Sequence, residues 1–150
     1  MQRGERGPPT GQAREVEEAI GYLEELVGRG YEALGVHERF SMRYLVIQAV
    51  ESMASVCIHI LARVFGERAE GYPECFVRLA ERRLIPRELG SRLARAARLR
   101  DLIVHRYWTI DDRLLFSAVE RGLGDLRDFV KHMRAFLEGA GVDKVLQRRP

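Results

Sequence analysis

The 150-residue sequence contains only two cysteines, and it lacks the spacings that bind metals or phosphates. Cys57 and Cys75 are too few for a disulfide framework and do not form a Cys-x-x-Cys pair, so a reducing compartment is expected. We expect each to pack in the core as a small apolar residue. No His/Cys pair has the spacing of zinc ligands, and no glycine-rich loop ends in the lysine and serine of a P-loop. The sequence therefore predicts neither a metal nor a cofactor.

Long hydrophobic segments are also missing. No apolar run approaches the roughly 20 residues that span a bilayer. Residues 1–12, MQRGERGPPTGQ, lack the apolar segment of a secretory signal. We therefore expect a cytoplasmic protein without membrane association.

Basic charge is present, but it is almost entirely of one kind. Hydrophobic residues make up 46% and charged residues 31%, as in ordinary globular proteins, and the length suits a single domain. All but two of the 25 Lys+Arg residues are arginine, which binds phosphate bidentately and stacks on bases. A GC-rich genome or a hot habitat would give the same bias. The net charge of +3 does not by itself indicate a nucleic-acid partner.

Helical periodicity recurs in five regions, and no segment has the period of a strand. The predicted fold class is all-α, an antiparallel bundle of about five helices. Residues 1–12 are expected to form a flexible lead, residues 13–138 the helical domain and residues 139–150 a basic tail. The predicted helices cover residues 13–28, 37–65, 73–82, 86–105 and 111–138.

Two of these regions carry special features. Residues 37–65 have a wide apolar stripe, which is typical of a central helix that contacts several neighbours. A second subunit could be one of these neighbours. Asp111 has the position of an N-cap for the last region. Gly122 and Gly124 each weaken that region by roughly 1 kcal/mol relative to alanine, which predicts a kink or break there.

A polar motif ends the fourth region. Asp101 and His105 are four residues apart and are neighbours on a helix surface. Arg100 and His105 are five residues apart, about 140° around a regular helix. They converge on one target only if the helix ends or bends near His105, or if a second copy of the chain completes the site.

The spacing Arg100-x4-His105-x-Tyr107, with Asp101 after the arginine, resembles the signature of HEPN-superfamily ribonucleases, in particular the HepT-like toxins. The matching succession of helices extends from Ala13 to Leu137. The resemblance implies a HEPN-like homodimer that cleaves RNA without metal. It also implies a partner, an MntA-type nucleotidyltransferase antitoxin that adenylylates the motif tyrosine, here Tyr107.

RNA cleavage by its own 2′-hydroxyl needs proton transfers and a stabilised phosphate. Histidine suits the proton transfers because its pKa lies near neutrality, so His105 is the predicted general base or acid. Arg100 is predicted to hold the phosphate, and Asp101 to orient the imidazole. A symmetric dimer would supply a second His105 for the other proton. The expected products end in 2′,3′-cyclic phosphate and 5′-hydroxyl groups.

Other residues near the motif have more than one interpretation. Tyr107 could stack on a base, whereas Trp108 is expected to pack the helix exit. His59 is expected to be a core or interface histidine. Four arginines are candidate RNA contacts, with a solvated helix face as the alternative: Arg92, Arg95, Arg98 and Arg106.

Two other functions compete with the ribonuclease. The chain could be a non-catalytic helical module that binds nucleotide or substrate for a separate nucleotidyltransferase. Tight nucleotide binding without RNA cleavage would favour that function. The third alternative is a purely structural bundle with an accidental motif, for which RNA would not change the protein's stability.

Overall fold

The computed structural model describes residues 9–139, which form α-helices and short 3₁₀ turns without a strand. This confirms the all-α prediction with five helices. Most of the predicted lead and tail lies outside the described residues. The helices are α1 (Pro9–Arg29), α2 (Val36–Phe65), α3 (Tyr72–Glu81), α4 (Arg87–His105) and α5 (Asp112–Gly139), with the 3₁₀ turns η2 (Tyr31–Ala33) and η3 (Tyr107–Thr109).

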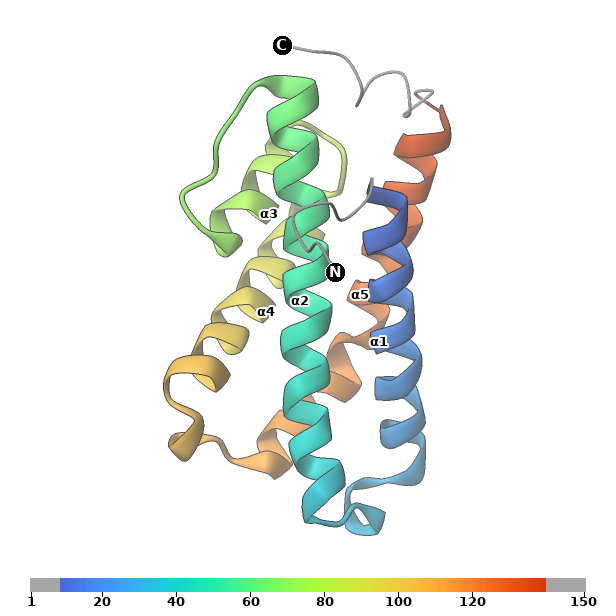
Figure 1. Cartoon of the computed structure of the whole chain (residues 1–150), viewed down its shortest axis with the longest axis vertical. Helices are drawn as coiled ribbons and strands as arrows, with labels where there is room; N and C mark the ends of the chain where they lie inside the picture. The colour runs from blue at the N-terminus through green and yellow to red at the C-terminus, as the bar shows by residue number, and fades with distance from the viewer. Residues whose placement is uncertain (1–8, 140–150) are drawn as a thin grey trace, which may run out of the picture.

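Helix α2 is the central element of the bundle. It runs antiparallel to α1 along the long axis of the molecule, while α3 and α4 lie on its other side and α5 passes behind it (Figure 1). Helix α2 contacts each of the four other α-helices. The predicted central helix with several neighbours is therefore confirmed within the bundle.

The core follows the predicted apolar periodicity. In α1 the buried side chains recur at helical spacing: Val16, Ala19, Ile20, Leu23 and Leu26. Cys57 and Cys75 are free and fully buried, as predicted. Burial raises the pKa of the Cys57 thiol, which also donates a hydrogen bond to the Cys75 carbonyl at 2.9 Å. A buried, protonated thiol is a poor nucleophile, so Cys57 has a packing role.

Helix α2 is also the one helix of the described chain long and apolar enough to cross a membrane, with a mean hydropathy of 1.8 over its most apolar window. The prediction that no apolar segment approaches the length needed to span a bilayer does not hold for α2. Because 61% of that window is buried inside the bundle, burial in a protein core accounts for its composition.

Asp111 caps α5 as predicted. Its Oδ1 accepts hydrogen bonds from the backbone N–H groups of Arg113 at 3.0 Å and Leu114 at 3.2 Å. The predicted break at Gly122 and Gly124 is wrong, because α5 is one uninterrupted helix. Its buried stripe extends on both sides of the glycines, and this packing outweighs their low helix propensity.

Helices α3 and α4 pack more closely than the sequence suggested. A Cβ added at Gly90 would lie 2.8 Å from the Ala80 Cβ and 3.0 Å from the Phe76 carbonyl oxygen. Gly90 therefore permits this close approach. Val77 of α3 and Leu114 of α5 carry apolar side chains but are exposed, at 40% and 67%, because each lies on the outer face of its helix.

Candidate active site

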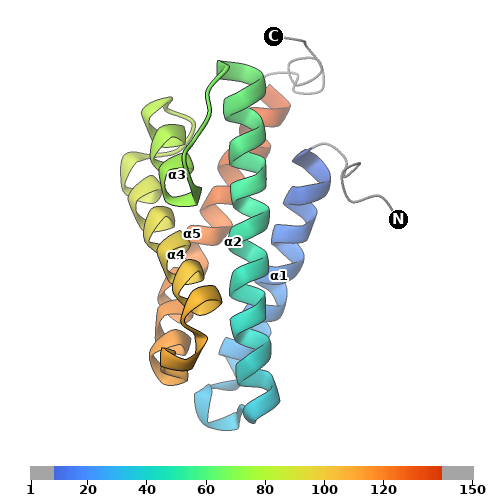
Figure 2. The same cartoon turned by 60° about the vertical axis from the view of Figure 1, so that its left-hand side comes forward.

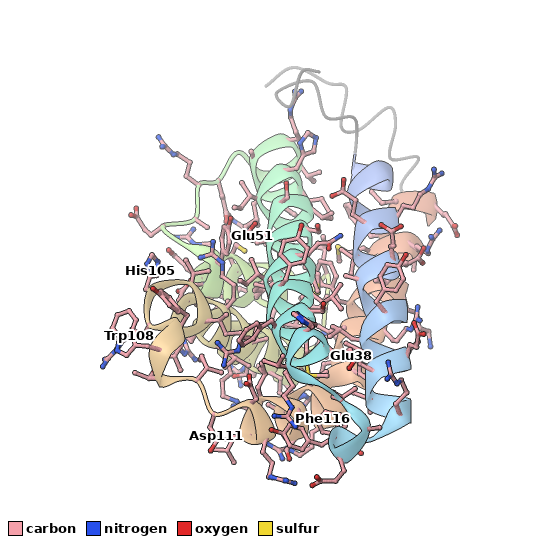
Figure 3. All side chains as sticks on the ribbon, turned by 60° about the horizontal axis from the view of Figure 1, so that its bottom comes forward. Glu38, Glu51, His105, Trp108, Asp111 and Phe116 are labelled. Carbon is pink, nitrogen blue, oxygen red and sulfur yellow. The ribbon has the colours of Figure 1, made fainter. Side chains whose placement is uncertain are left out.

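The polar motif lies where α4 ends. The helix stops at His105, and Arg106 (φ −138°, ψ 44°) leads the chain into η3. Tyr107 and Trp108 are 61% and 67% exposed. Figure 3 shows His105 and Trp108 projecting outward from this corner of the bundle. The helix thus ends at the position that convergence of Arg100 and His105 requires.

Trp108 does not pack the helix exit, so that prediction is wrong. Its ring meets the Tyr107 ring edge to face, with centroids 5.3 Å apart, and both rings remain exposed. In Figure 3 the Trp108 side chain points away from the helices. Two adjacent exposed aromatic rings beside a histidine form a surface on which bases can stack.

Arg100 is held by three side chains from three helices. Its Nη2 lies 2.5 Å from Oε2 of Glu51 on α2, and its Nη1 lies 2.8 Å from Oδ1 of Asp101. The guanidinium also lies over the Tyr72 ring of α3, 5.0 Å from the centroid. Only 18% of the Arg100 side chain is exposed. These contacts fix the position of the guanidinium.

The charges of this cluster are coupled. Burial acts to lower the pKa of Arg100, but the hydrogen bonds to Glu51 and Asp101 outweigh it, so the pKa is raised above its ordinary value. Burial and then the Glu51 carboxylate raise the pKa of Tyr72. One cation therefore faces two carboxylates, and an incoming anion would compete with them for Arg100.

Asp101 does not orient His105 in this structure. Its carboxylate accepts the hydrogen bond from Arg100, and within residues 9–139 the His105 side chain makes no hydrogen bond. The predicted pairing of Asp101 with His105 is therefore replaced by a pairing with Arg100. The exposed His105 imidazole is free to meet a substrate or a second subunit.

Arg43 of α2 anchors the segment that carries Tyr107. Its guanidinium forms a two-pronged ion pair with Asp112, with Nε to Oδ1 at 2.7 Å and Nη2 to Oδ2 at 3.0 Å. Its Nη1 also donates to the Tyr107 carbonyl oxygen at 3.3 Å. One side chain thus ties α2 both to η3 and to the first residue of α5, which positions Tyr107.

Sequence reasoning missed Glu51, Tyr72 and Arg43. Glu51 had a usable signal, because an acidic residue in the apolar run around Val50 must find a partner when its helix is buried. Arg43 is also a charged residue in this apolar helix, but it lies near the start of α2, so its need for a partner was a weaker signal. Tyr72 had none, since its contact with Arg100 depends on how α3 packs.

A polar groove adjoins Arg100's partners. A cavity of about 640 Å³ is lined by Glu51, Ser52, His59 and Tyr72, among others. His59 is half-buried there rather than in the core. Burial and then the Arg63 charge hold the pKa of His59 below its ordinary value, so its imidazole is neutral at neutral pH. No group of three or more His, Cys, Asp or Glu side chains in the described chain could hold a metal ion.

The four candidate RNA-contacting arginines lie in different surroundings. Arg92 is paired with Asp125 of α5 at 2.9 Å. Together with Arg95 it lines a separate cavity between α4 and α5. Arg98 and Arg106 are exposed nearer the motif end of α4.

The all-α bundle thus carries Arg100-x4-His105-x-Tyr107 at the end of its fourth helix and in the turn that follows. Residues 16–133 match the family model described as "Ribonuclease HepT-like". The chain therefore belongs to the HepT-like ribonuclease family. No protein among the curated sequences matches it.

Solved structures share the fold at low sequence identity. One is the tri-AMPylated Shewanella oneidensis HEPN toxin in complex with MNT antitoxin, with a TM-score of 0.77, 19% identity, and coverage of 85% of this chain and 96% of that chain. Another is a toxin-antitoxin complex with AMP-PNP, with a TM-score of 0.77, 18% identity, and coverage of 85% and 97%. A third is the cytosolic protein of unknown function YutE from Bacillus subtilis, with a TM-score of 0.69, 16% identity, and coverage of 86% and 92%.

Proposed function

We propose that this chain is a metal-independent endoribonuclease, the cytoplasmic toxin of a HepT/MntA-type toxin–antitoxin pair. The observation that carries the proposal is the exposed His105 at the end of α4, with Arg100 and Tyr107 around it, in a member of the HepT-like ribonuclease family. The family supplies the reaction class. The proposed residues and their roles rest on the motif and on the exposure of its side chains.

The reaction needs one base, one acid and a stabilised phosphate. His105 takes the proton from the ribose 2′-hydroxyl, and the 2′-oxygen then bonds to phosphorus. The bond from phosphorus to the 5′-oxygen breaks, and an acid protonates that oxygen. Arg100 stabilises the phosphoryl oxygens after the phosphate replaces the Asp101 carboxylate on its guanidinium. The products carry 2′,3′-cyclic phosphate and 5′-hydroxyl ends.

A homodimer supplies the acid, since one histidine does not serve both proton transfers in one step. In a two-fold dimer the second His105 enters the same cleft. Helix α2 supports this arrangement, because it exposes Phe40 at 53%, Tyr44 at 63% and Ile58 at 38%. Light scattering should therefore give the mass of a dimer in solution. A monomer that remains active at the lowest assay concentrations would contradict the two-subunit site.

Tyr107 is the proposed acceptor for AMP from a nucleotidyltransferase antitoxin. Its side chain is 61% exposed, so an enzyme can reach the hydroxyl. The similar Shewanella oneidensis toxin is AMPylated and bound to its antitoxin, which supports this partner. AMP on Tyr107 would obstruct the site beside His105 and place negative charge where RNA phosphate must lie.

Exposed arginines around the motif attract the RNA backbone. Arg98 and Arg106 are the nearest candidates along the chain. Arg92 and Arg95 extend the positive charge along α4, although the Asp125 carboxylate neutralises Arg92 locally. These contacts go to phosphates, so they contribute affinity rather than sequence preference.

The test is cleavage of total RNA in excess EDTA by the wild-type protein and by His105→Ala. We expect the wild type to cut and His105→Ala to be at least about 100-fold slower, the size of a lost acid–base group. His37→Ala is the matched control, because His37 is also an exposed histidine but lies outside the motif. Equal cleavage by His105→Ala and the wild type would contradict the proposal.

One observation favours a second candidate, a non-catalytic module that binds nucleotide for a nucleotidyltransferase. Glu51 and Asp101 already occupy Arg100, which suits a binding residue that is not presented for chemistry. This candidate predicts stoichiometric nucleotide binding and no cleavage of RNA by protein whose intact mass shows an unmodified chain. Cleavage that depends on His105 excludes it.

A further inference from the structure

A second cavity lies away from the polar groove, between α4 and α5. It has a volume of about 450 Å³, within the range of small-molecule pockets. All four long helices contribute apolar walls, including Leu23 of α1, Val50 of α2, Leu93 of α4 and Leu126 of α5. Figure 2 shows α5 passing behind α2 and α4. The cavity is therefore part of the fold and not a feature of one loop.

The polar residues of this cavity are mostly cationic. Arg92 and Arg95 come from α4, Arg121 and Asp125 from α5. Arg92 pairs with Asp125 at 2.9 Å, which neutralises one pair. Arg95 and Arg121 are exposed and, across residues 9–139, enter no ion pair. Two uncompensated cations thus stand beside an apolar interior.

We propose that this cavity binds a medium-chain alkyl carboxylate. The alkyl chain fills the apolar interior, and the carboxylate is held by Arg95 and Arg121. The charge of the rim selects an anion. A nucleobase fits less well, because leucine, valine and alanine walls leave its ring nitrogens and exocyclic groups without hydrogen-bond partners.

Binding at this site can be measured apart from RNA cleavage, although the site shares α4 with the motif and Arg95 with the proposed RNA contacts. Leu99 lines the cavity directly before Arg100 in α4. Binding is therefore measured on the protein itself, without reference to ribonuclease activity. If the chain proves not to cleave RNA, the carboxylate-binding proposal still stands. If octanoate does not bind, the ribonuclease proposal still stands.

The first experiment is calorimetric titration of the full chain with octanoate, compared with octanol and octylammonium. We expect octanoate to bind at one site per chain, with affinity that rises from butanoate to octanoate and stops rising once the cavity is full. Octylammonium should bind at least about tenfold more weakly, because it loses a charge-assisted hydrogen bond and meets like charge. Equal binding of octanoate and octylammonium would overturn the proposal.

The second experiment fills the cavity. Gly122 lines it, and a Cβ there would meet no atom within 4 Å, so larger side chains extend into the open space. Gly124 has the same open surroundings on the same helix but does not line the cavity, which makes it the matched control. Gly122→Phe should abolish octanoate binding, whereas Gly124→Phe should bind as the wild type does.

Gly122→Leu serves as a smaller filler, and circular dichroism checks that each variant is folded. Arg95→Gln should weaken octanoate binding by about tenfold. Unchanged binding in a folded Gly122 variant would overturn the proposal. The proposal would also be overturned if the wild-type protein bound no octanoate while a Gly122 variant changed the mass of the assembly. The cavity would then be a contact between subunits.

Discussion

At the scale of single residues, the site combines one side chain that is fixed by its neighbours with one that is free. Arg100 is fixed by Glu51, Asp101 and Tyr72, whereas His105 projects from the helix end without a partner in the described chain. A fixed cation positions a phosphate with little loss of side-chain entropy. In the proposed reaction the free imidazole meets the reacting hydroxyl. This arrangement suits proton transfer at a phosphate better than it suits a structural ion pair.

Tyr107→Phe should separate regulation from chemistry. The variant keeps the aromatic ring but has no hydroxyl to accept AMP, so incubation with a cognate nucleotidyltransferase and ATP should add no mass. Its RNA cleavage should stay within a few-fold of the wild type and should no longer be inhibited by the partner. Intact-mass spectrometry gives the readout, and Tyr22→Phe is the control because Tyr22 is an exposed tyrosine outside both the motif and the proposed dimer surface. AMP addition to Tyr107→Phe would contradict the assignment.

At the scale of the elements, most of the fold could be predicted from the sequence. Apolar periodicity gave the five helices, and Asp111 marked the start of α5. The predicted break in α5 is absent, because core packing holds the helix together through Gly122 and Gly124. Helix propensity alone therefore did not predict the course of this helix. The partners of Arg100 could not be predicted, since they depend on how three helices pack.

Gly90 and Gly124 should respond oppositely to alanine. Gly90→Ala places a methyl group 2.8 Å from Ala80, so α3 and α4 must separate, and the free energy of unfolding should fall by about 1–3 kcal/mol. Gly124→Ala meets open space and should raise it by up to about 1 kcal/mol through helix propensity. Urea denaturation measures both changes. A stabilised Gly90→Ala variant would contradict the close packing of α3 on α4.

The contact between α1 and α5 should weaken in acid. Hydrogen bonds from Arg134 to Glu17 and from Arg127 to Glu24 hold the pKa of each carboxyl below its ordinary value of 4.5. A carboxyl whose pKa is lowered by folding stabilises the protein above its ordinary pKa, and this contribution is lost as the pH falls through the folded-state pKa. Both side chains are partly exposed, so the contribution is small and screened by salt.

The double variant Glu17→Gln/Glu24→Gln tests this contribution. Its free energy of unfolding should fall less than that of the wild type when the pH is lowered from neutral to below about 4.5. Glu18→Gln/Glu25→Gln, on exposed positions of the same helix, should follow the wild-type curve. Identical acid dependence for all three proteins would show that the two ion pairs do not stabilise the contact.

At the scale of the whole molecule, the surface divides into regions with different proposed tasks. The end of α4 and η3 presents His105, Tyr107 and Trp108. Helix α2 exposes apolar side chains beside the polar groove, which suits a second copy of the chain. The cavity between α4 and α5 is separate from both. The proposed function depends on the end of α4 and η3, because this region contains the residues proposed for RNA cleavage.

The chemistry of the cut ends tests that central claim most directly. A defined RNA oligonucleotide is incubated with the wild-type protein in excess EDTA, and the products are identified by mass spectrometry. Attack by the 2′-hydroxyl through His105 and Arg100 predicts fragments with 2′,3′-cyclic phosphate and 5′-hydroxyl ends, and no fragments with His105→Ala. Fragments with 5′-phosphate and 3′-hydroxyl ends, or cleavage that requires a divalent metal, would contradict the account.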